Sequence, residues 1–465
     1  MALFYDALGK DGIKATLAFG LLVGWVVSLL YEGPLLYALA RSRGVEGAAI
    51  DAADLLLLAV GLLAATRLTL PSPEAWRRLL LGTGAACLAG TLLLPLLPGR
   101  FLYAVFPLLS LAAGACMAAW GHLLKGAVPR PGRVYVAPVA MVLACLVLTP
   151  VHALTALADP RLGGGLIVLA LAGHAALLLN LSVPNQTVCP PRLDNPAFIL
   201  RHFGILFLSI FLITFNAGFM FQAVYPLFAE HEILSSLYTN APYVAAILVC
   251  AAFPRIRRLQ TLYVGLALWG FSLILFTNLP PSAPVFLAVI TLMLFAAGLF
   301  DYFWWSIFTK NLDSTRNPST LAGTILAATI LGSLAGGQLT NLLAGAGVAS
   351  AHLGQWGLAA ILANMVLIGA VNRRLAPILR NQRFLEETTP SAEEQRLAMV
   401  RETLSPREMD VFLLLRGGCA NKDICETLHI SLNTVKTHNR KIFAKLGLSD
   451  RTELQQQFPA PELPN

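Results

Sequence analysis

The chain has 465 residues, of which 57% are hydrophobic and 12% are charged, and its formal net charge is +8. A soluble protein carries about a quarter charged residues, so the composition excludes an ordinary soluble protein. The deficit is local, because long apolar runs dominate from Leu17 to Val371, whereas roughly the last eighty residues have soluble composition. Much of the positive charge lies in loops beside apolar runs, where Lys and Arg set membrane topology, and does not indicate nucleic-acid binding by the whole chain.

The spacing of reactive residues gives no indication of an enzyme. The seven cysteines form no CxxC pair and the eight histidines form no HExxH motif, so we expect neither a metal site nor a disulfide framework. We interpret the scattered cysteines as small apolar residues. The sequence also lacks a nucleophile or phosphate-loop pattern, and we therefore expect a non-enzymatic protein without a cofactor.

Apolar runs of roughly 17–25 residues can cross a bilayer as helices. The first run is too long for a signal-peptide core and is followed by basic residues, so we predict that it is retained. Twelve such runs are predicted, at residues 15–40, 52–70, 78–97, 101–124, 134–157, 163–183, 201–226, 237–253, 260–279, 284–308, 320–346 and 354–372.

The distribution of positive charge predicts the topology of these spans. With the N-terminus in the cytoplasm, the inner loops hold thirteen Lys and Arg residues and the outer loops hold four. Because cytoplasmic loops are enriched in these residues, the bias predicts twelve spans with both termini inside.

The longest central loop, residues 183–199 (VPNQTVCPPRLDNPAFI), separates six predicted spans from six. This 6+6 arrangement resembles the major facilitator superfamily (MFS), whose two halves enclose a midplane cavity. The resemblance is architectural and covers about 370 residues. Transporters of that family usually carry a Gly-x-x-x-Asp-Arg-x-Gly-Arg-Arg loop after the second span. Here that loop reads TRLTLPSPEAWRR, without the Gly/Asp pattern, which counts against active transport.

Polar side chains within the spans are candidates for a ligand cavity, because they are costly in lipid. Glu32 and Asp301 each have long apolar stretches on at least one side, and Trp304 beside Asp301 can stack on an aromatic guest. The alternative is that such amides join neighbouring helices and such aromatic rings anchor the chain at the membrane interface. The predicted ligand-binding residues are Glu32, Asn216, Asp301 and Trp304; further candidates are Gln222, Asn240, Gln338 and Asn341.

The C-terminal residues predict a small helical domain. Ser405, Pro406 and Glu408 are an N-cap, a first helical residue and a capping-box partner. A second helix is predicted from Asn421 to Leu428. A third follows and ends at Gly447, with a fourth running towards Phe458.

The third predicted helix has two faces. Val435, Ile442 and Leu446 fall within about 40° of one another, which indicates a core-facing side. Asn433, Lys436, Thr437 and Arg440 lie on the opposite side, and the helix carries four cations and no acid. These cations are Lys436, Arg440, Lys441 and Lys445.

This segment, LSPREMDVFLLL…GCANKDI…L.ISLNTVKTHNRKIFAKLGLSDRTEL, closely resembles the LuxR-type helix-turn-helix (HTH) over about 55 residues. The resemblance implies that the third of four helices enters the major groove and that the fourth pairs two domains. It implies that Lys436, Thr437 and Arg440 face bases and that Asn433 and Thr434 suit phosphates. Ala420 departs from the family's usual cap of the second helix, where Asn421 can substitute. The predicted DNA-binding residues are Asn433, Thr434, Lys436, Thr437, Arg440 and Lys441; the predicted dimerisation residues are Thr452, Leu454, Gln455 and Phe458.

We therefore predict an all-α protein in three parts: a polytopic membrane helix bundle of about 12 spans (1–374), a linker (375–399) and a four-helix LuxR-type HTH domain (400–465). The predicted function is a one-component transcriptional regulator in the bacterial cytoplasmic (inner) membrane that senses a small molecule in its bundle. Its expected partners are promoter DNA, a small-molecule ligand, a second copy as a homodimer on DNA, the lipid bilayer and RNA polymerase. The alternatives are an MFS-type transporter with a regulatory DNA-binding tail and a sensor of membrane state without a soluble ligand.

Overall fold

The computed structural model divides the chain into two compact units, residues 1–375 and 376–465. We describe each unit by itself. The residues described are 2–31, 33–70, 72–181, 196–228, 237–238, 240–252, 258–310, 312, 317–348, 350–388, 400 and 403–458.

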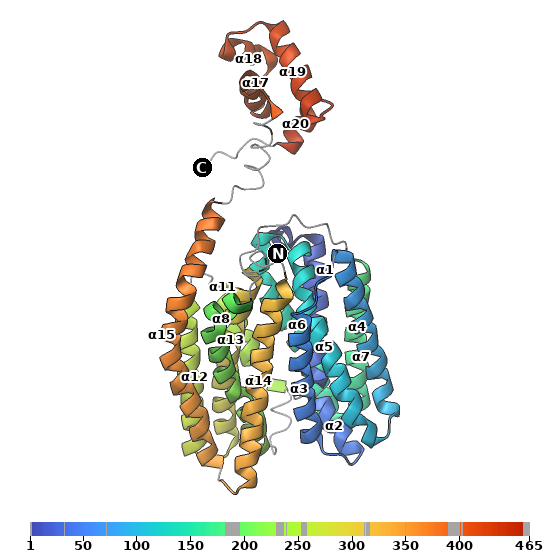
Figure 1. Ribbon diagram of the computed structural model, residues 1–465, viewed down its shortest axis with the longest axis vertical. Coiled ribbons are helices and arrows are strands. Elements are labelled where there is room, and N and C mark those ends of the chain that lie inside the picture. The colour runs from blue at the N-terminus through green and yellow to red at the C-terminus, as the bar shows by residue number, and fades with distance from the viewer. Residues whose placement is uncertain are drawn as a thin grey trace. The chain divides into compact units, whose positions relative to one another are not determined.

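The first unit is a bundle of long apolar helices (Figure 1). Eleven helices of the described residues are long and apolar enough to cross a membrane. They are α1 (Ala2–Leu29), α3 (Gly47–Ala65), α4 (Pro73–Leu93), α5 (Gly99–Ala127), α6 (Arg133–Leu157), α7 (Pro160–Leu179), α8 (Pro196–Phe219), α12 (Arg258–Asn278), α13 (Ala283–Lys310), α14 (Pro318–Gly345) and α15 (Ser350–Thr388). Where the eighth span was predicted, the structure has the shorter apolar helix α11 (Asn240–Ala252).

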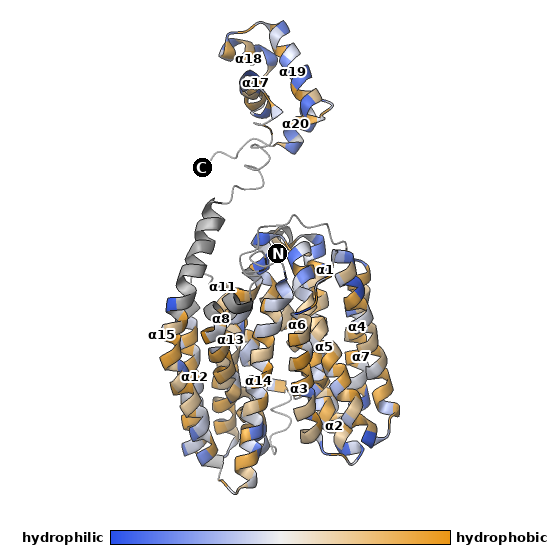
Figure 2. Ribbon diagram, in the orientation of Figure 1, coloured by the Kyte–Doolittle hydropathy of each residue, from blue (hydrophilic) through white to orange (hydrophobic). Residues whose placement is uncertain are grey.

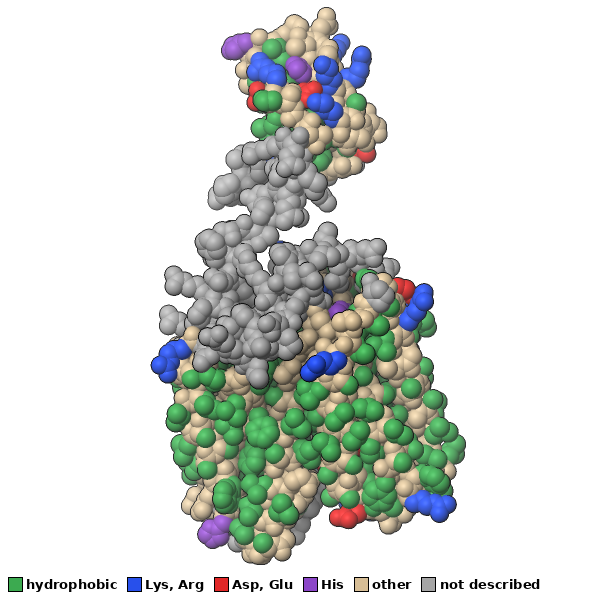
Figure 3. Space-filling model, viewed as in Figure 1, with side chains coloured by type: hydrophobic (Ala, Val, Ile, Leu, Met, Phe, Trp, Pro, Cys, Tyr) green, Lys and Arg blue, Asp and Glu red, His purple; other side chains and the backbone are tan. Residues whose placement is uncertain are grey.

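The outer surface of the bundle matches a lipid environment. Hydrophobic residues extend along the helices (Figure 2), and hydrophobic side chains cover the flank in Figure 3, where Lys and Arg lie towards its ends. Leu96, Leu146, Leu169 and Val366 are 66–81% exposed. A soluble monomer rarely exposes contiguous apolar surface on this scale, so the structure is that of a multi-pass membrane protein.

The predicted first span, residues 15–40, is wrong at its C-terminal end. Helix α1 ends at Leu29 and a separate helix α2 (Pro34–Ser42) follows. Pro34 has no backbone N–H to donate and therefore begins a helix rather than continuing one. Its predecessor Gly33 has an extended backbone.

Small residues allow the closest helix contacts within the bundle. A Cβ atom at Gly336 of α14 would collide with the Phe215 carbonyl oxygen of α8, and one at Gly114 of α5 would collide with the Leu58 carbonyl oxygen of α3. Helix α14 of the second half also packs on α3 and α5 of the first half. Glycines of α14 therefore serve tight packing.

The second unit contains the four predicted helices of the C-terminal domain. These are α17 (Pro406–Arg416), α18 (Asn421–Leu428), α19 (Leu432–Leu446) and α20 (Arg451–Gln457). They enclose a common core that includes Val411, Phe412, Ile424, Val435 and Ile442, each fully buried. Helix α15 continues past the last span to Thr388, so the first part of the predicted linker is helical; residues 389–399 lie outside the described residues.

The predicted capping box at the start of α17 is confirmed. Ser405 Oγ accepts from the Glu408 backbone N–H at 3.4 Å, and Glu408 Oε2 accepts from the Ser405 N–H at 2.8 Å. Glu408 is 4% exposed. Its Oε2 also accepts from Lys445 Nζ at 2.6 Å. Lys445 and the Ser405 N–H together lower the pKa of Glu408 from 4.5 to about 2.

The Glu408–Lys445 contact predicts a pH dependence of stability. Because the folded-state pKa of Glu408 is about 2 and its ordinary value is 4.5, the stabilisation is complete above pH 4.5 and is lost as the pH falls towards 2. In urea unfolding of a 397–465 fragment, Glu408→Gln should lower the free energy of unfolding at neutral pH by about 2 kcal/mol. It should also flatten the acid decline. Glu426→Gln, at an exposed position on α18, is the control; equal acid sensitivity in Glu408→Gln and wild type would contradict the assignment.

Candidate DNA-binding surface and membrane cavity

Helix α19 presents the predicted DNA-contacting face to solvent. Its N-cap is Ser431, whose Oγ accepts from the Thr434 backbone N–H at 3.2 Å, and its C-cap Gly447 has a left-handed backbone (φ 68°). Val435 and Ile442 are fully buried against the other helices. The structure exposes all the predicted DNA-binding side chains: Asn433, Thr434, Lys436, Thr437, Arg440 and Lys441.

The cations of α19 fall into two groups. Within the described part of the chain, Lys436, Arg440 and Lys441 make no ion pair. Lys445 instead binds Glu408, so it serves the fold of the domain. The positive surface of the helix therefore comes from three side chains rather than the four counted in the sequence.

The angle between α18 and α19 is held by a contact that the sequence pattern missed. Asn439 Nδ2 donates to Asn421 Oδ1 at 3.1 Å. Asn421 was expected to cap α18, but the N-cap is Ala420, whose N–H donates to Asp423 Oδ2 at 3.0 Å. Asp423 satisfies this backbone group, which leaves Asn421 to join the two helices.

Helix α20 is held to its own domain by most of the residues predicted to pair two copies. Leu454 is fully buried, the Phe458 ring lies 5.3 Å from the Phe412 ring, and Gln455 Nε2 donates to the Leu415 carbonyl at 3.1 Å. The assignment of Leu454 to a dimer interface is therefore corrected. Thr452 is the exposed member of the predicted set.

A cavity of about 730 Å³ lies between the two halves of the membrane bundle. A volume of this size suits a drug-sized molecule. Helices α1, α3, α5 and α6 of the first half and α8, α11, α13 and α14 of the second contribute to its walls. Its lining includes Tyr225 and reaches Arg41 of α2, a helix at the end of the bundle opposite the N-terminus (Figure 1).

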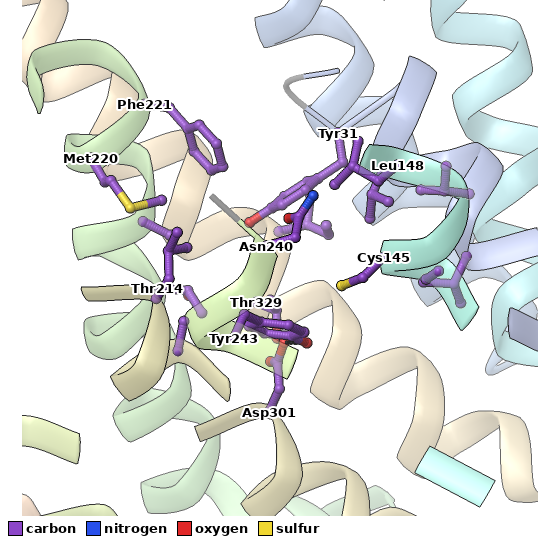
Figure 4. Close-up of a pocket in the computed structure, with 18 of the residues that line it drawn as sticks. Tyr31, Cys145, Leu148, Thr214, Met220, Phe221, Asn240, Tyr243, Asp301 and Thr329 are labelled. Atoms are coloured by element: carbon purple, nitrogen blue, oxygen red, sulfur yellow. Dashed lines mark hydrogen bonds between the residues drawn. The ribbon is translucent and has the colours of Figure 1, made fainter. Parts of the chain in front are cut away.

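Asp301 is the one acid among the described residues of the cavity wall, and several polar side chains gather around it (Figure 4). Tyr243 of α11 donates its hydroxyl to Asp301 Oδ2 at 2.5 Å. Asn240, one turn earlier on α11, donates to Thr149 Oγ1 of α6 at 2.8 Å and so bridges the halves. Cys145 of α6 also lines this part of the cavity.

The predicted ligand residues separate into three cases. Asp301 and Trp304 line the cavity. Asn216 is fully buried outside the lining, with its Nδ2 donating to the Leu212 carbonyl at 3.2 Å and its Oδ1 close to Gly357 of α15. Asn216 is therefore corrected to a packing residue between α8 and α15. Glu32 lies outside the described residues.

At the end of the bundle opposite to α2, polar contacts join the two halves. Asn317, the N-cap of α14, lies with its Oδ1 3.0 Å from His122 Nε2 of α5. Its Nδ2 donates to the Thr66 carbonyl at 3.0 Å, just after α3. The Trp76 ring of α4 stacks on the His122 ring at 3.7 Å. We refer to Asn317, His122, Thr66 and Trp76 as the end closure.

Helix α15 is tied to the cavity wall through α8. Asn364 of α15 accepts from Ser209 Oγ at 2.6 Å and donates to the Ser209 carbonyl at 2.8 Å. Ile213 and Thr214, one turn further along α8, line the cavity. The sequence prediction missed Asn364 and Tyr243; the available signal was a single polar side chain within an otherwise apolar run.

The C-terminal domain matches a known family. The family described as "Bacterial regulatory proteins, luxR family" matches residues 402–457. The transcriptional regulatory protein LiaR of Bacillus subtilis is 45% identical over 56 residues, which is 12% of this chain and 26% of that protein. The response regulator protein VraR of Staphylococcus aureus is 43% identical over 56 residues, again 12% of this chain and 27% of that protein. The chain thus matches about a quarter of the length of these relatives.

The membrane bundle resembles solved transporters in fold. The MFS transporter FucP, solved in the outward conformation, has a TM-score of 0.56 at 13% identity, with 79% of this chain and 99% of that chain covered. The human organic anion transporter MFSD10 (TETRAN) has a TM-score of 0.55 at 15% identity, with 77% of this chain and 97% of that chain covered. The chain therefore joins a membrane domain of the major facilitator fold to a C-terminal LuxR-type helix-turn-helix domain.

Proposed function

We propose that the protein is a membrane-bound one-component transcriptional regulator that senses a small molecule in its bundle and thereby controls promoter binding. The observation that carries the proposal is the presence, on one chain, of a cavity between two helical halves and a LuxR-type domain whose α19 exposes three cations that make no ion pair with the described residues. These parts give it a non-enzymatic role. The excess of Lys and Arg on one side supports a bacterial inner-membrane location with both termini in the cytoplasm.

On DNA, α19 lies in the major groove. Lys436, Thr437 and Arg440 contact base edges, while Asn433, Thr434 and Lys441 contact phosphates. A dimer places two copies of α19 on successive half-sites, and RNA polymerase is the further partner at the promoter.

The ligand is a small amphipathic molecule with hydroxyl or amine groups that binds near Asp301 and Trp304. Since the cavity and the end closure are both built between the halves, a guest that draws the halves together around Asp301 loosens the contact of Asn317 with His122. Helix α15 moves with α8 through Asn364 and Ser209. It continues to Thr388 and so carries this movement towards the DNA-binding domain.

The alternative is an MFS-type transporter with a regulatory tail. The observation in its favour is the cavity itself, because MFS transporters bind their substrates between the same two halves. Uptake of a cavity ligand into proteoliposomes, driven by its own gradient or by a proton gradient, would establish transport. Binding without uptake supports the sensor.

Lys436→Ala and Arg440→Ala should each weaken operator binding by about 1–3 kcal/mol, because each removes a donor from the exposed face of α19. Gel shifts with the 397–465 fragment measure this, with Glu426→Gln as control. Membrane insertion of the full chain should be unchanged. Wild-type affinity in both variants would refute the assignment of this face.

The operator should be an inverted repeat with half-sites about one helical turn apart, because two-fold-related HTH domains read successive turns of the groove. Footprinting with the full-length protein should protect both half-sites. Thr452→Arg, which adds positive charge at the exposed position of α20, should reduce cooperative occupation of the second half-site. A single asymmetric half-site in the wild type would contradict dimeric binding.

The end closure predicts variants that signal without ligand. Asn317→Ser keeps a side-chain oxygen to cap α14 but loses the reach to His122 and Thr66, and His122→Phe keeps a ring for Trp76 but loses the hydrogen bond. Both should shift a promoter reporter towards the ligand-bound level. Asn278→Ser is the control, because Asn278 is exposed at the end of α12 and, among the described residues, its side chain donates within its own helix, to the Ile274 carbonyl. Reporter output that stays at the wild-type level in both closure variants would exclude the closure from signalling.

A further inference from the structure

We propose that the cavity ligand is an organic cation: an amine with an aromatic or otherwise apolar body, whose charged group binds Asp301. The inference rests on the proposed function, in which a small molecule binds in this cavity, and it names the charge of that molecule. It is carried by the placement of charge, hydrogen bonds and aromatic rings in the lining.

The first observation is the distribution of charge. Among the described lining residues, Asp301 is the sole carboxylate and Arg41 is the sole Lys or Arg. Arg41 is exposed on α2. Asp301 lies one turn of α13 from Trp304 and Trp305, which are 2% and 5% exposed. Apart from Arg41, the described lining therefore offers a charged group one carboxylate and no Lys or Arg.

The second observation is the hydrogen bonding of Asp301. Tyr243 donates to Oδ2 and so fixes the orientation of the carboxyl group. Trp304 also forms a side-chain hydrogen bond to the Asp301 carboxylate. A carboxylate offers about four acceptor positions, and these two donors occupy two of them. An ammonium group has up to three donors and no acceptor, so it complements the remaining capacity, whereas a guest carboxylate would bring only acceptors and a like charge.

The third observation is the aromatic wall around this acid. The Phe300 ring stacks between Trp304 at 6.2 Å and Trp269 at 6.0 Å, and all three residues line the cavity. Tyr31 reaches the same space from the first half (Figure 4). Aromatic faces attract cations and also bury an apolar body, so both ends of an aromatic amine find partners here.

The fourth observation concerns the two halves. Asp301, Tyr243 and Trp304 belong to the second half, while Tyr31 and Cys145 belong to the first. A cation that binds Asp301 and packs on Tyr31 therefore contacts both. The charge of the guest draws it to one half and its apolar body engages the other, which is the contact pattern that a ligand needs to change their separation.

The test uses three aromatic scaffolds (phenyl, indolyl and naphthyl), each carrying an ethylamine, an ethanol or an acetate group. Within each scaffold the three probes share the same ring system and differ in the charge of the attached group. The indolyl set, for example, is tryptamine, tryptophol and indole-3-acetate. Their affinities are measured by calorimetry on the full-length protein in lipid nanodiscs. For at least one scaffold, the amine should bind about tenfold or more tightly than its alcohol and its acetate, as a charge-assisted hydrogen bond in a desolvated site implies.

Asp301→Asn keeps the shape of the side chain and should remove the preference for amines while the alcohols bind as before. Glu46→Gln, at an exposed acid beside α3 and outside the cavity lining, should retain the preference. The proposal is overturned if no amine binds, if an alcohol or acetate binds as tightly as its amine, or if Asp301→Asn keeps the preference.

Operator affinity, measured on the same nanodiscs, separates this inference from the proposed function. Amines that bind without changing operator affinity would refute sensing and leave the ligand class standing. Alcohols or acetates that change operator affinity when amines do not would refute the ligand class and leave sensing standing.

Discussion

A polar group in the hydrocarbon core of a bilayer costs several kcal/mol unless protein groups form hydrogen bonds with it. This cost limits where the membrane bundle can place polar side chains. Among the described residues, side-chain hydrogen bonds join the halves at two places. One is the cavity, where Asn240 meets Thr149. The other is the end closure, where Asn317 meets His122 and the Thr66 carbonyl. Between them α14 packs on α3 and α5 through apolar and small residues. The two polar contact sites are therefore candidates for contacts that form in alternation: in one conformation the halves approach at the cavity and separate at the end closure, and in the other the reverse holds.

The C-terminal domain follows the opposite constraint, because it folds around an apolar core in water. Its polar side chains divide into those that hold the fold and those that remain for a partner. Two pairs hold the fold: Glu408 with Lys445 joins α17 to α19, and Asn421 with Asn439 joins α18 to α19. Lys436, Arg440 and Lys441 are left exposed on one side of α19. This division is what a DNA-reading surface requires, since a cation that already has a buried partner adds little to phosphate or base binding.

The features that could be predicted from sequence are those that depend on residues close together in the chain. Apolar runs indicated the spanning helices, and the capping box and helical periodicity indicated the four C-terminal helices and the exposed face of α19. The errors share one cause, which is that spatial partners are not local. Asn216 and Asp301 looked alike as polar residues in apolar runs, yet one faces Gly357 of α15 and the other faces the cavity. Lys445 was counted among the four cations of the third helix, and its pairing was not visible because its partner Glu408 lies 37 residues away. The break at Pro34 is the exception, since it is local and was available in the sequence.

The central claim is that the state of the cavity and the binding of DNA are coupled, and coupling is reciprocal. If a guest in the cavity changes operator affinity, operator DNA must change the separation of the halves even when no guest is present. Spin labels at Glu46, just before α3 in the first half, and at Leu279, just after α12 in the second, both exposed, measure that separation in nanodiscs. Saturating operator DNA should shift the distance distribution between the labels, and DNA of unrelated sequence should not. An unchanged distribution with the operator fully bound would contradict the account.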